Sequence, residues 1–162
     1  MQLCLAMKHV HDRKVLHRDL KPQNIFLTRK NFVRLGDFGI SKVLSGTMSV
    51  ASTCVGTPLY LAPELCEGKE YNNKCDVWSL GVLMYEFLVG SPPFELGPGE
   101  QLSALNQKII NSLVSVPSDM AASAKSLIKG LLMPQACMRL GASKRGAREV
   151  LNHRWFDDIS FD

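Results

Sequence analysis

Residues 17–39 of the chain read HRDLKPQNIFLTRKNFVRLGDFG. It holds two short apolar runs, 25–27 and 32–35, on either side of the polar tetrapeptide 28–31. Runs of this length joined by four polar residues are typical of two antiparallel strands and their turn. The stretch therefore predicts a β-hairpin.

Side chains that can bind metal ions or phosphate gather at one end of this expected hairpin. Asn24 precedes the first strand and Asp37 follows the second, so antiparallel pairing brings the two residues to the same end. Asp19 lies in the loop before them, together with Lys21 and Arg18. Such a set is suited to Mg²⁺ and a polyphosphate, because Mg²⁺ takes a few protein oxygens plus phosphate oxygens. Spacing alone leaves an alternative equally open, in which Asp and Asn cap turns beside exposed basic residues.

Length and composition favour one globular domain over residues 1–162. The chain is 46% hydrophobic and 21% charged, which excludes a disordered, collagen-like or coiled-coil protein. Its longest apolar stretch, 77–90, is interrupted by Glu86 and falls short of the roughly 18 residues of a membrane-spanning helix. The chain begins without a secretory signal pattern, and its cysteines form no Cys-x-x-Cys pair. We therefore expect reduced thiols, no membrane partner, and a cytoplasmic location, with the nucleus and the cytoskeleton as alternatives.

The remainder of the chain predicts a succession of helices. Apolar spacing places them over residues 3–10, from residue 63 onward, and over 77–89, 102–110, 124–132 and 148–152. Asp76 heads the 77–89 helix, which is hydrophobic nearly all round and therefore belongs in the middle of the core. Ser118 or Asp119 is expected to cap the 124–132 helix. Residues 39–61, rich in Gly, Ser and Thr, predict a long loop. The expected fold class is mainly α with a small β-hairpin.

Basic residues concentrate in the first quarter of the chain. Residues 1–42 hold nine Lys or Arg against three Asp, a net charge of +6, whereas the remainder carries −2. This distribution favours either a phosphate-bearing ligand or a solvated basic face. The acidic balance of the remainder opposes nucleic-acid binding, so no nucleic-acid partner is expected.

Three short motifs in the right order resemble those of protein kinases. Residues 17–24 match the H-R-D-L-x-x-x-N catalytic loop, residues 37–39 match D-F-G, and residues 62–64 match A-P-E. The whole chain resembles the C-terminal lobe of a eukaryotic serine/threonine protein kinase. Residues 35–42, 53–60 and 71–78 look most like NIMA-related kinases, whereas 139–141, 145–150 and 153–156 resemble the end of this lobe in the cyclic-nucleotide-dependent and receptor-kinase group.

This resemblance implies a role for each residue at the hairpin end. Asp19 would be the catalytic base that accepts the proton of a substrate hydroxyl, and Lys21 would stabilise the transferred γ-phosphate of ATP. Asn24 and Asp37 would bind Mg²⁺ and, through it, ATP. Lys21 and Thr57 are what serine/threonine kinases carry at these places, so the implied substrates are Ser and Thr hydroxyls of proteins.

The resemblance also implies regulatory and structural residues. Thr53 would be phosphorylated by an activating kinase, and Arg18 would receive that phosphate through charge-assisted hydrogen bonds. Glu64 and Arg139 would form the ion pair that ties the activation segment to the lobe. Asp76 would brace the backbone of residues 17–18, although a helix N-cap equally explains an Asp at this position.

Two parts of the kinase signature do not occur in these 162 residues. They are the G-x-G-x-x-G loop over the phosphates and the lysine of the V-A-I-K strand. We therefore expect the N-terminal lobe to be absent from this chain, and the chain alone to bind nucleotide weakly with negligible activity. The leading hypothesis is a phosphotransferase. The alternative is a non-catalytic docking or scaffold module, which has no need for all of Asp19, Lys21, Asn24 and Asp37.

Overall fold

The computed structural model describes residues 1–38, 42–43, 58–111, 114–143 and 146–159. Its α-helices are α1 (Gln2–Asp12), α2 (Pro63–Cys66), α3 (Lys74–Val89), α4 (Leu102–Asn111), α5 (Ala122–Leu131) and α6 (Ala147–Leu151). Single 3₁₀ turns are η1 (Pro22–Asn24), η2 (Pro58–Tyr60) and η3 (Arg154–Phe156), and the strands are β1 (Val15–Leu16), β2 (Ile25–Leu27), β3 (Val33–Leu35) and β4 (Lys42–Val43). The predicted mainly helical fold with a small hairpin is confirmed. Among the described residues, no helix is long and apolar enough to cross a membrane.

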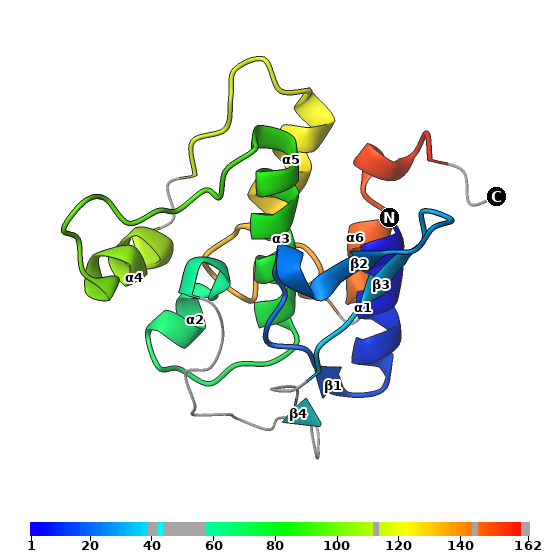
Figure 1. The fold of residues 1–162 in the computed structure, drawn as a ribbon, viewed down its shortest axis with the longest axis horizontal. Coiled ribbons are helices and arrows are strands. Elements are labelled where there is room, and N and C mark those ends of the chain that lie inside the picture. The colour runs from blue at the N-terminus through cyan, green and yellow to red at the C-terminus, as the bar shows by residue number, and fades with distance from the viewer. Residues whose placement is uncertain (39–41, 44–57, 112–113, 144–145, 160–162) are drawn as a thin grey trace.

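Helix α3 runs through the centre of the molecule, with α2 and α4 on one side and α1, α6 and the β2–β3 hairpin on the other (Figure 1). Its residues from Cys75 to Leu83 are all buried, as the sequence predicts for a helix that is hydrophobic nearly all round. The last turn differs, because Phe87 and Leu88 are exposed. Gly90 ends the helix in the left-handed conformation at φ 89°, which a glycine adopts without steric cost.

A glycine allows α3 and α5 to approach closely. A Cβ atom at Gly81 would lie 2.8 Å from Cβ of Leu131 and 2.8 Å from Cδ2 of Leu132, too close for any real contact. Leu127, Ile128 and Leu131 of α5 are completely buried in this interface. Close packing of these two helices forms the middle of the hydrophobic core.

The β2–β3 hairpin packs against α1. Its register pairs Ile25 with Leu35 and Leu27 with Val33. The side chain of Gln2 joins helix and hairpin, since its Oε1 accepts a hydrogen bond from the backbone N–H of Val33 at 2.7 Å. Because α1 is part of the core and also contacts α6, this packing ties the hairpin to the rest of the fold.

The hairpin is one residue shorter than predicted. The second strand begins at Val33, not at Phe32, because Phe32 belongs to the turn. Its backbone N–H donates to Oγ1 of Thr28, and its carbonyl accepts from the backbone N–H of Thr28. Asn31 takes the left-handed conformation at φ 59°, which Asn tolerates better than most residues. These contacts close the turn.

The predicted cap of the 124–132 helix, the N-cap alternative for Asp76 and part of the predicted loop are wrong, whereas the other alternative for Asp76, a brace for residues 17–18, is confirmed. Helix α5 begins after Ala121 without a side-chain cap, so neither Ser118 nor Asp119 caps it; the carbonyl of Ser118 instead accepts a hydrogen bond from Lys125. Helix α3 begins at Lys74, which places Asp76 inside its first turn and not at the N-cap. Within the predicted loop 39–61, β4 pairs with β1 and η2 forms a 3₁₀ turn, while residues 39–41 and 44–57 lie outside the described part of the chain.

Candidate active site

One buried carboxylate holds the loop 17–24 in place. Asp76 accepts a hydrogen bond from the backbone N–H of His17 at 2.9 Å and another from that of Arg18 at 2.8 Å. Nε2 of His11 on α1 lies 2.8 Å from Oδ2 of the same carboxylate. Burial disfavours the charged form of Asp76, but these hydrogen bonds outweigh burial and keep its pKa below the ordinary value. The turn that precedes Asp19 is therefore fastened to the first turn of α3.

The backbone of this turn is strained. Arg18 has φ 68°, in the left-handed region that non-glycine residues rarely adopt. Strain of this kind costs of order 1–3 kcal/mol and persists only where the surroundings hold it. The two backbone hydrogen bonds that Asp76 accepts provide that support, and the resulting conformation orients the next residue, Asp19.

A histidine connects this loop to the end of the hairpin. His17 is almost completely buried, and its Nε2–H donates to the carbonyl of Gly36 at 3.0 Å. Because a carbonyl can only accept, Nδ1 carries no proton in the neutral ring, and it accepts from the backbone N–H of Asp19 at 3.4 Å. The ring also meets Phe38 edge to face, with ring centroids 4.8 Å apart. These contacts place the loop beside the segment that carries Asp37.

The structure brings three of the predicted site residues into direct contact. Nδ2 of Asn24 donates to the backbone carbonyl of Asp19 at 2.8 Å and to its Oδ2 at 3.1 Å. Nζ of Lys21 lies 2.6 Å from the same Oδ2. An amide hydrogen and an ammonium group therefore both orient the Asp19 carboxylate, which also gives Lys21 a fixed place next to it.

Asn24 and Asp37 lie at the same end of the hairpin, as antiparallel pairing predicts. The backbone N–H of Gly36 donates to the carbonyl of Asn24 at 3.0 Å and closes this end. Asn24 is buried and its Nδ2 is already engaged, so Oδ1 is the oxygen that it offers to a cation. Asp37 is exposed and adopts φ 57°. An amide oxygen and a carboxylate at one edge are ligands that fit Mg²⁺.

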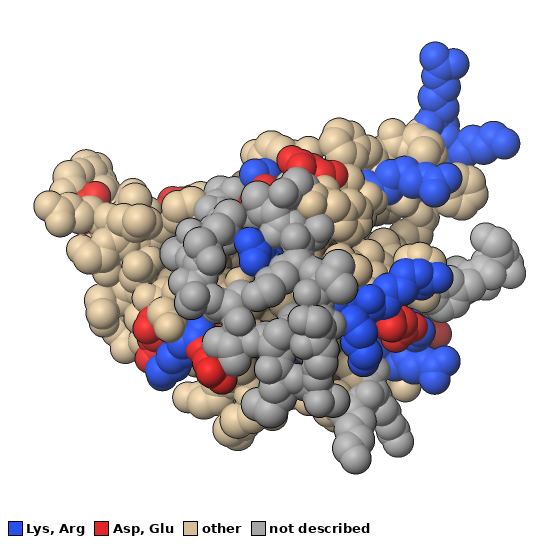
Figure 2. Space-filling view, turned by 90° about the horizontal axis from the view of Figure 1, so that it is seen from below, with Lys and Arg blue, Asp and Glu red and all other residues tan. Residues whose placement is uncertain are grey.

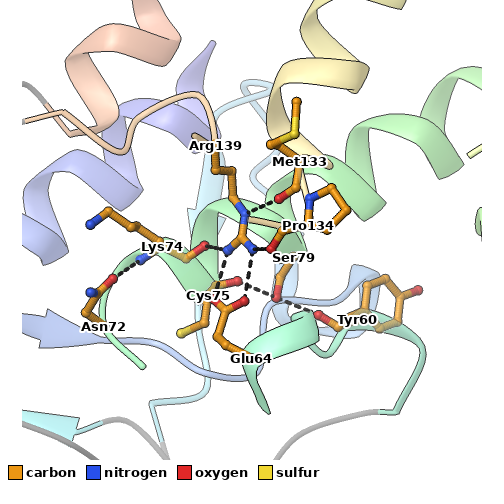
Figure 3. Close-up of polar contacts among 9 residues, drawn as sticks. All are labelled: Tyr60, Glu64, Asn72, Lys74, Cys75, Ser79, Met133, Pro134 and Arg139. Carbon is orange, nitrogen blue, oxygen red and sulfur yellow. Dashed lines mark hydrogen bonds and ion pairs between the residues drawn. The ribbon is translucent and has the colours of Figure 1, made fainter. Parts of the chain in front are cut away.

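A buried ion pair between Glu64 and Arg139 connects α2 to the segment that follows α5. Nη1 and Nη2 of Arg139 donate to Oε1 and Oε2 of Glu64, each at 2.9 Å. The remaining N–H groups of Arg139 donate to the carbonyl oxygens of Met133, Pro134 and Lys74 at 2.9, 3.1 and 2.6 Å (Figure 3). All five donors of this guanidinium are thus satisfied, which a buried arginine requires.

The same arginine stacks on the core aromatic residues. Its guanidinium carbon lies 5.2 Å from the ring centroid of Trp78, and Trp78 in turn stacks on Phe94 at 5.9 Å. Next to it, Oγ of Ser79 donates to the carbonyl of Tyr60 at 2.8 Å (Figure 3). The hydroxyl of Tyr60 donates to Glu86 at 2.7 Å, and burial together with this carboxylate raises the pKa of the phenol. The segment around residues 58–64 is therefore anchored to α3.

Arg18, predicted to receive a phosphate, directs its side chain toward Tyr71. Nη1 of Arg18 donates to the Tyr71 hydroxyl at 3.1 Å. Thr53 and Thr57, predicted in the activation segment, lie outside the described residues. Lys and Arg side chains gather at the end of the molecule where α1 and the hairpin lie (Figure 2), in agreement with the basic first quarter of the sequence.

Sequence reasoning missed three residues at this site. His11 pairs with Asp76 across 65 positions, and Tyr71 contacts Arg18 across 53 positions, distances at which no local pattern exists. The third is Phe26, which is 53% exposed although it is aromatic. The exposure of Phe26 could have been predicted from the sequence. Successive side chains of a strand point to opposite faces, so in a strand that starts right after Asn24 the side chain of Phe26 faces away from that of Ile25.

Comparison with known proteins gives consistent results. Residues 1–156 match the family model described as the protein kinase domain. The chain is 60% identical over 97 residues to serine/threonine-protein kinase Nek1 of Mus musculus, covering 60% of this chain and 8% of that protein. It is 37% identical over 160 residues to serine/threonine-protein kinase AtPK1/AtPK6 of Arabidopsis thaliana, covering 99% and 33%. It is also 37% identical over 161 residues to the cAMP-dependent protein kinase catalytic subunit of Dictyostelium discoideum, covering 99% and 24%. The chain thus spans a third or less of the length of each of these relatives.

Proposed function

The chain belongs to the protein kinase domain family, and on this premise we propose that it is the C-terminal lobe of a serine/threonine protein kinase. The proposed reaction is transfer of the γ-phosphate of ATP to Ser and Thr hydroxyls of proteins. The observation that carries this proposal is the contact of Asn24 and Lys21 with one carboxylate oxygen of Asp19. A scaffold protein would not need such an arrangement.

Each residue of this cluster has a defined task in the proposed reaction. Asp19 accepts the proton of the attacking hydroxyl, and the amide of Asn24 keeps its carboxylate oriented. The Lys21 ammonium, held 2.6 Å from that carboxylate, offsets the negative charge of the phosphoryl group near the acceptor. The reaction thus depends mainly on positioning and charge neutralisation.

ATP and Mg²⁺ are the proposed cofactors. Asn24 and Asp37 would hold Mg²⁺, which when bound neutralises charge on the phosphates. Phe26 offers an exposed aromatic face on the strand next to Asn24, on which a nucleobase can stack. The chain has neither the glycine-rich loop nor the V-A-I-K lysine, so we propose that a small lobe completes the nucleotide site.

The subfamily and the regulation are part of the same proposal. The similarity to Nek1 supports assignment of the chain to the NIMA-related kinases. The alignment with the cAMP-dependent enzyme extends over nearly the whole chain and supports a C-terminal end like that of the cyclic-nucleotide-dependent group. We propose activation by another kinase at Thr53, with Arg18 as the receiving cation. Thr53→Ala should then lower the activity of the complete kinase even after incubation with the activating kinase. Equal activity of variant and wild type would contradict this part.

The central test is a matched pair of carboxylate variants in the complete kinase. Asp19→Asn should lower the rate of phosphate transfer from radiolabelled ATP to a Ser/Thr peptide about 10²- to 10⁴-fold, because the catalytic base is removed. Asp12→Asn is the control, since Asp12 is an exposed carboxylate on α1 that pairs with Lys8. It should leave the rate unchanged. A peptide array should show phosphorylation of Ser and Thr, and robust phosphorylation of Tyr would contradict the proposed acceptor class.

The 162-residue chain by itself should bind ATP only weakly, as measured by calorimetry, and should show negligible phosphate transfer. This expectation follows from dividing the nucleotide site between two lobes. Turnover by the isolated chain that Asp19→Asn abolishes would show that this chain completes its own site. Fluorescent tagging in cells tests the proposed cytoplasmic location against the nucleus and the cytoskeleton.

A further inference from the structure

We propose that two copies of this chain pair through a self-complementary surface on the side of the molecule that carries the β2–β3 hairpin. One half of this surface, the hairpin tip, comprises three turn residues and one residue of β3, namely Arg29, Lys30, Phe32 and Arg34. The other half, the acidic end, is residues 157–159, which read Asp-Asp-Ile and follow η3. The hairpin tip is the end of the hairpin opposite Asn24 and Asp37, so this inference goes beyond the proposed reaction.

The first argument is the positive charge of the hairpin tip. Arg29, Lys30 and Arg34 are all exposed, and none of them forms an ion pair within the described residues. Hydrogen bonds between Thr28 and Phe32 close the turn, so these basic side chains extend from a fixed backbone. Like charges that are held close together repel each other, and a surface of opposite charge therefore stabilises them.

The second argument is the apolar surface at the same tip. Phe32 is 55% exposed, and Leu27, at the end of β2 beside the turn, is 70% exposed. Contact with a partner would remove this apolar surface from water, which is favourable. A basic face that is merely solvated has no need of a large exposed aromatic side chain. Aromatic and arginine side chains together are instead typical of the centre of a protein–protein interface.

The third argument is the chemistry of the acidic end. Asp157 and Asp158 are exposed and form no ion pair in the part of the chain that the structure describes, and the next residue, Ile159, is 43% exposed. The backbone N–H of Ile159 donates to the carbonyl of Phe156 at 3.1 Å, and Phe156 is buried, so this segment is attached to the core. The acidic end thus presents two negative charges beside an apolar side chain, which complements the positive charges and the Phe32 ring of the hairpin tip.

The fourth argument is the placement of the two halves on one molecule. The turn between β2 and β3 and the red segment after η3 both lie on the right-hand side of Figure 1. Helix α1 contacts both β3 and α6, the helix that directly precedes η3. Within one copy, no ion pair joins the two halves among the described residues. A two-fold axis that passes between them places the hairpin tip of each copy on the acidic end of the other, so both surfaces are used and association stops at two copies.

Analytical ultracentrifugation of the 162-residue chain tests this pairing over about a hundredfold range of concentration. We expect an equilibrium between monomer and dimer. Its dissociation constant should rise at least about tenfold between roughly 0.05 and 0.5 M salt, because salt screens exposed charges. Lys30→Glu and Asp158→Lys should each raise the dissociation constant at least about tenfold, because like charges then face each other at both contacts of the dimer.

An equimolar mixture of these two variants is the decisive sample. In a mixed pair the reversed charge of one variant faces the reversed charge of the other, and the second contact stays native. The mixture should therefore form dimers as tightly as wild type, and this recovery also shows that both variants are folded. Lys69→Glu and Glu67→Lys are the controls, since they make the same charge changes just after α2, on the other side of α3. They should leave the dissociation constant unchanged.

Three results would overturn the proposal. The first is a wild-type chain that stays monomeric at every concentration, or a mixture of variants that does not regain pairing. The second is a series of species that grow beyond two copies, which excludes the two-fold arrangement. The third is a monomeric chain that instead binds vesicles of phosphatidylcholine and phosphatidylserine and loses this binding in Lys30→Glu, which makes the hairpin tip a lipid-binding surface. None of these measurements depends on phosphate transfer, so their failure is distinct from failure of the proposed function.

Discussion

Replacement of Glu64 by Gln tests the buried ion pair at the back of the site. In the native chain all five N–H donors of Arg139 have acceptors, and two of these acceptors are the carboxylate oxygens of Glu64. Gln keeps one oxygen and turns the other into an NH₂ group, which faces an N–H of Arg139 and cannot accept from it. The guanidinium would then be a buried charge without a counter-charge. Breaking a buried pair in this way typically costs about 3–5 kcal/mol.

This loss is a large fraction of the free energy of unfolding of a typical domain, about 5–15 kcal/mol. Urea denaturation followed by tryptophan fluorescence measures it on the 162-residue chain, because Trp78 lies under Arg139 and reports on the packing there. With a slope of about 2 kcal/mol per molar urea, the midpoint should fall by roughly 2 M.

The control removes a charge from a surface pair. Glu67 lies 2.8 Å from Nζ of Lys69, but 64% of the lysine side chain is exposed. Glu67→Gln should therefore change the free energy of unfolding by less than about 1 kcal/mol. If Glu64→Gln costs as little as this control, then the buried pair is not what stabilises this region, and the reasoning from its hydrogen bonds is refuted.

Three further predictions concern packing and pH. Gly81→Ala should lower stability in urea by about 1–3 kcal/mol, because the added Cβ would collide with Leu131, and an unchanged midpoint would contradict the close helix approach. The pKa of His153 is lowered, because burial and the neighbouring Arg154 disfavour the charged ring, so the folded state binds fewer protons than the unfolded chain. Stability should then decrease as the pH falls below about 6.5, and it should decrease less in His153→Gln when the two are compared by thermal unfolding. Asp76→Asn should cost about 1–3 kcal/mol in urea at neutral pH, because Asn has one acceptor oxygen for the two backbone N–H groups and its NH₂ group can only donate. In wild type, acid protonates this carboxyl below about pH 3.8 and removes its contribution to stability, and the variant should lack this acid-dependent loss; identical acid profiles would refute the assignment.

The part of this protein that local patterns determine is its backbone. Two short apolar runs separated by a polar turn predicted the β2–β3 hairpin. Gly90 and the prolines after it predicted the end of α3. Short motifs then placed Asn24 and Asp37 at one end of the hairpin, because antiparallel pairing leaves no other arrangement. Such features depend on neighbours a few residues away, so they can be predicted from local sequence patterns.

Tertiary structure decided which side chains meet. The sequence left Asp76 open between a helix N-cap and a brace for residues 17–18, and the choice depends on where α3 begins and which way its first turn faces. That direction is set by packing of α3 against the loop and α1, where His11 completes the contacts of the carboxylate. The contact between Tyr71 and Arg18 likewise joins segments 53 positions apart. The contacts His11–Asp76 and Arg18–Tyr71 cannot be predicted from any local sequence pattern. They form only when packing of the hydrophobic core brings distant segments together.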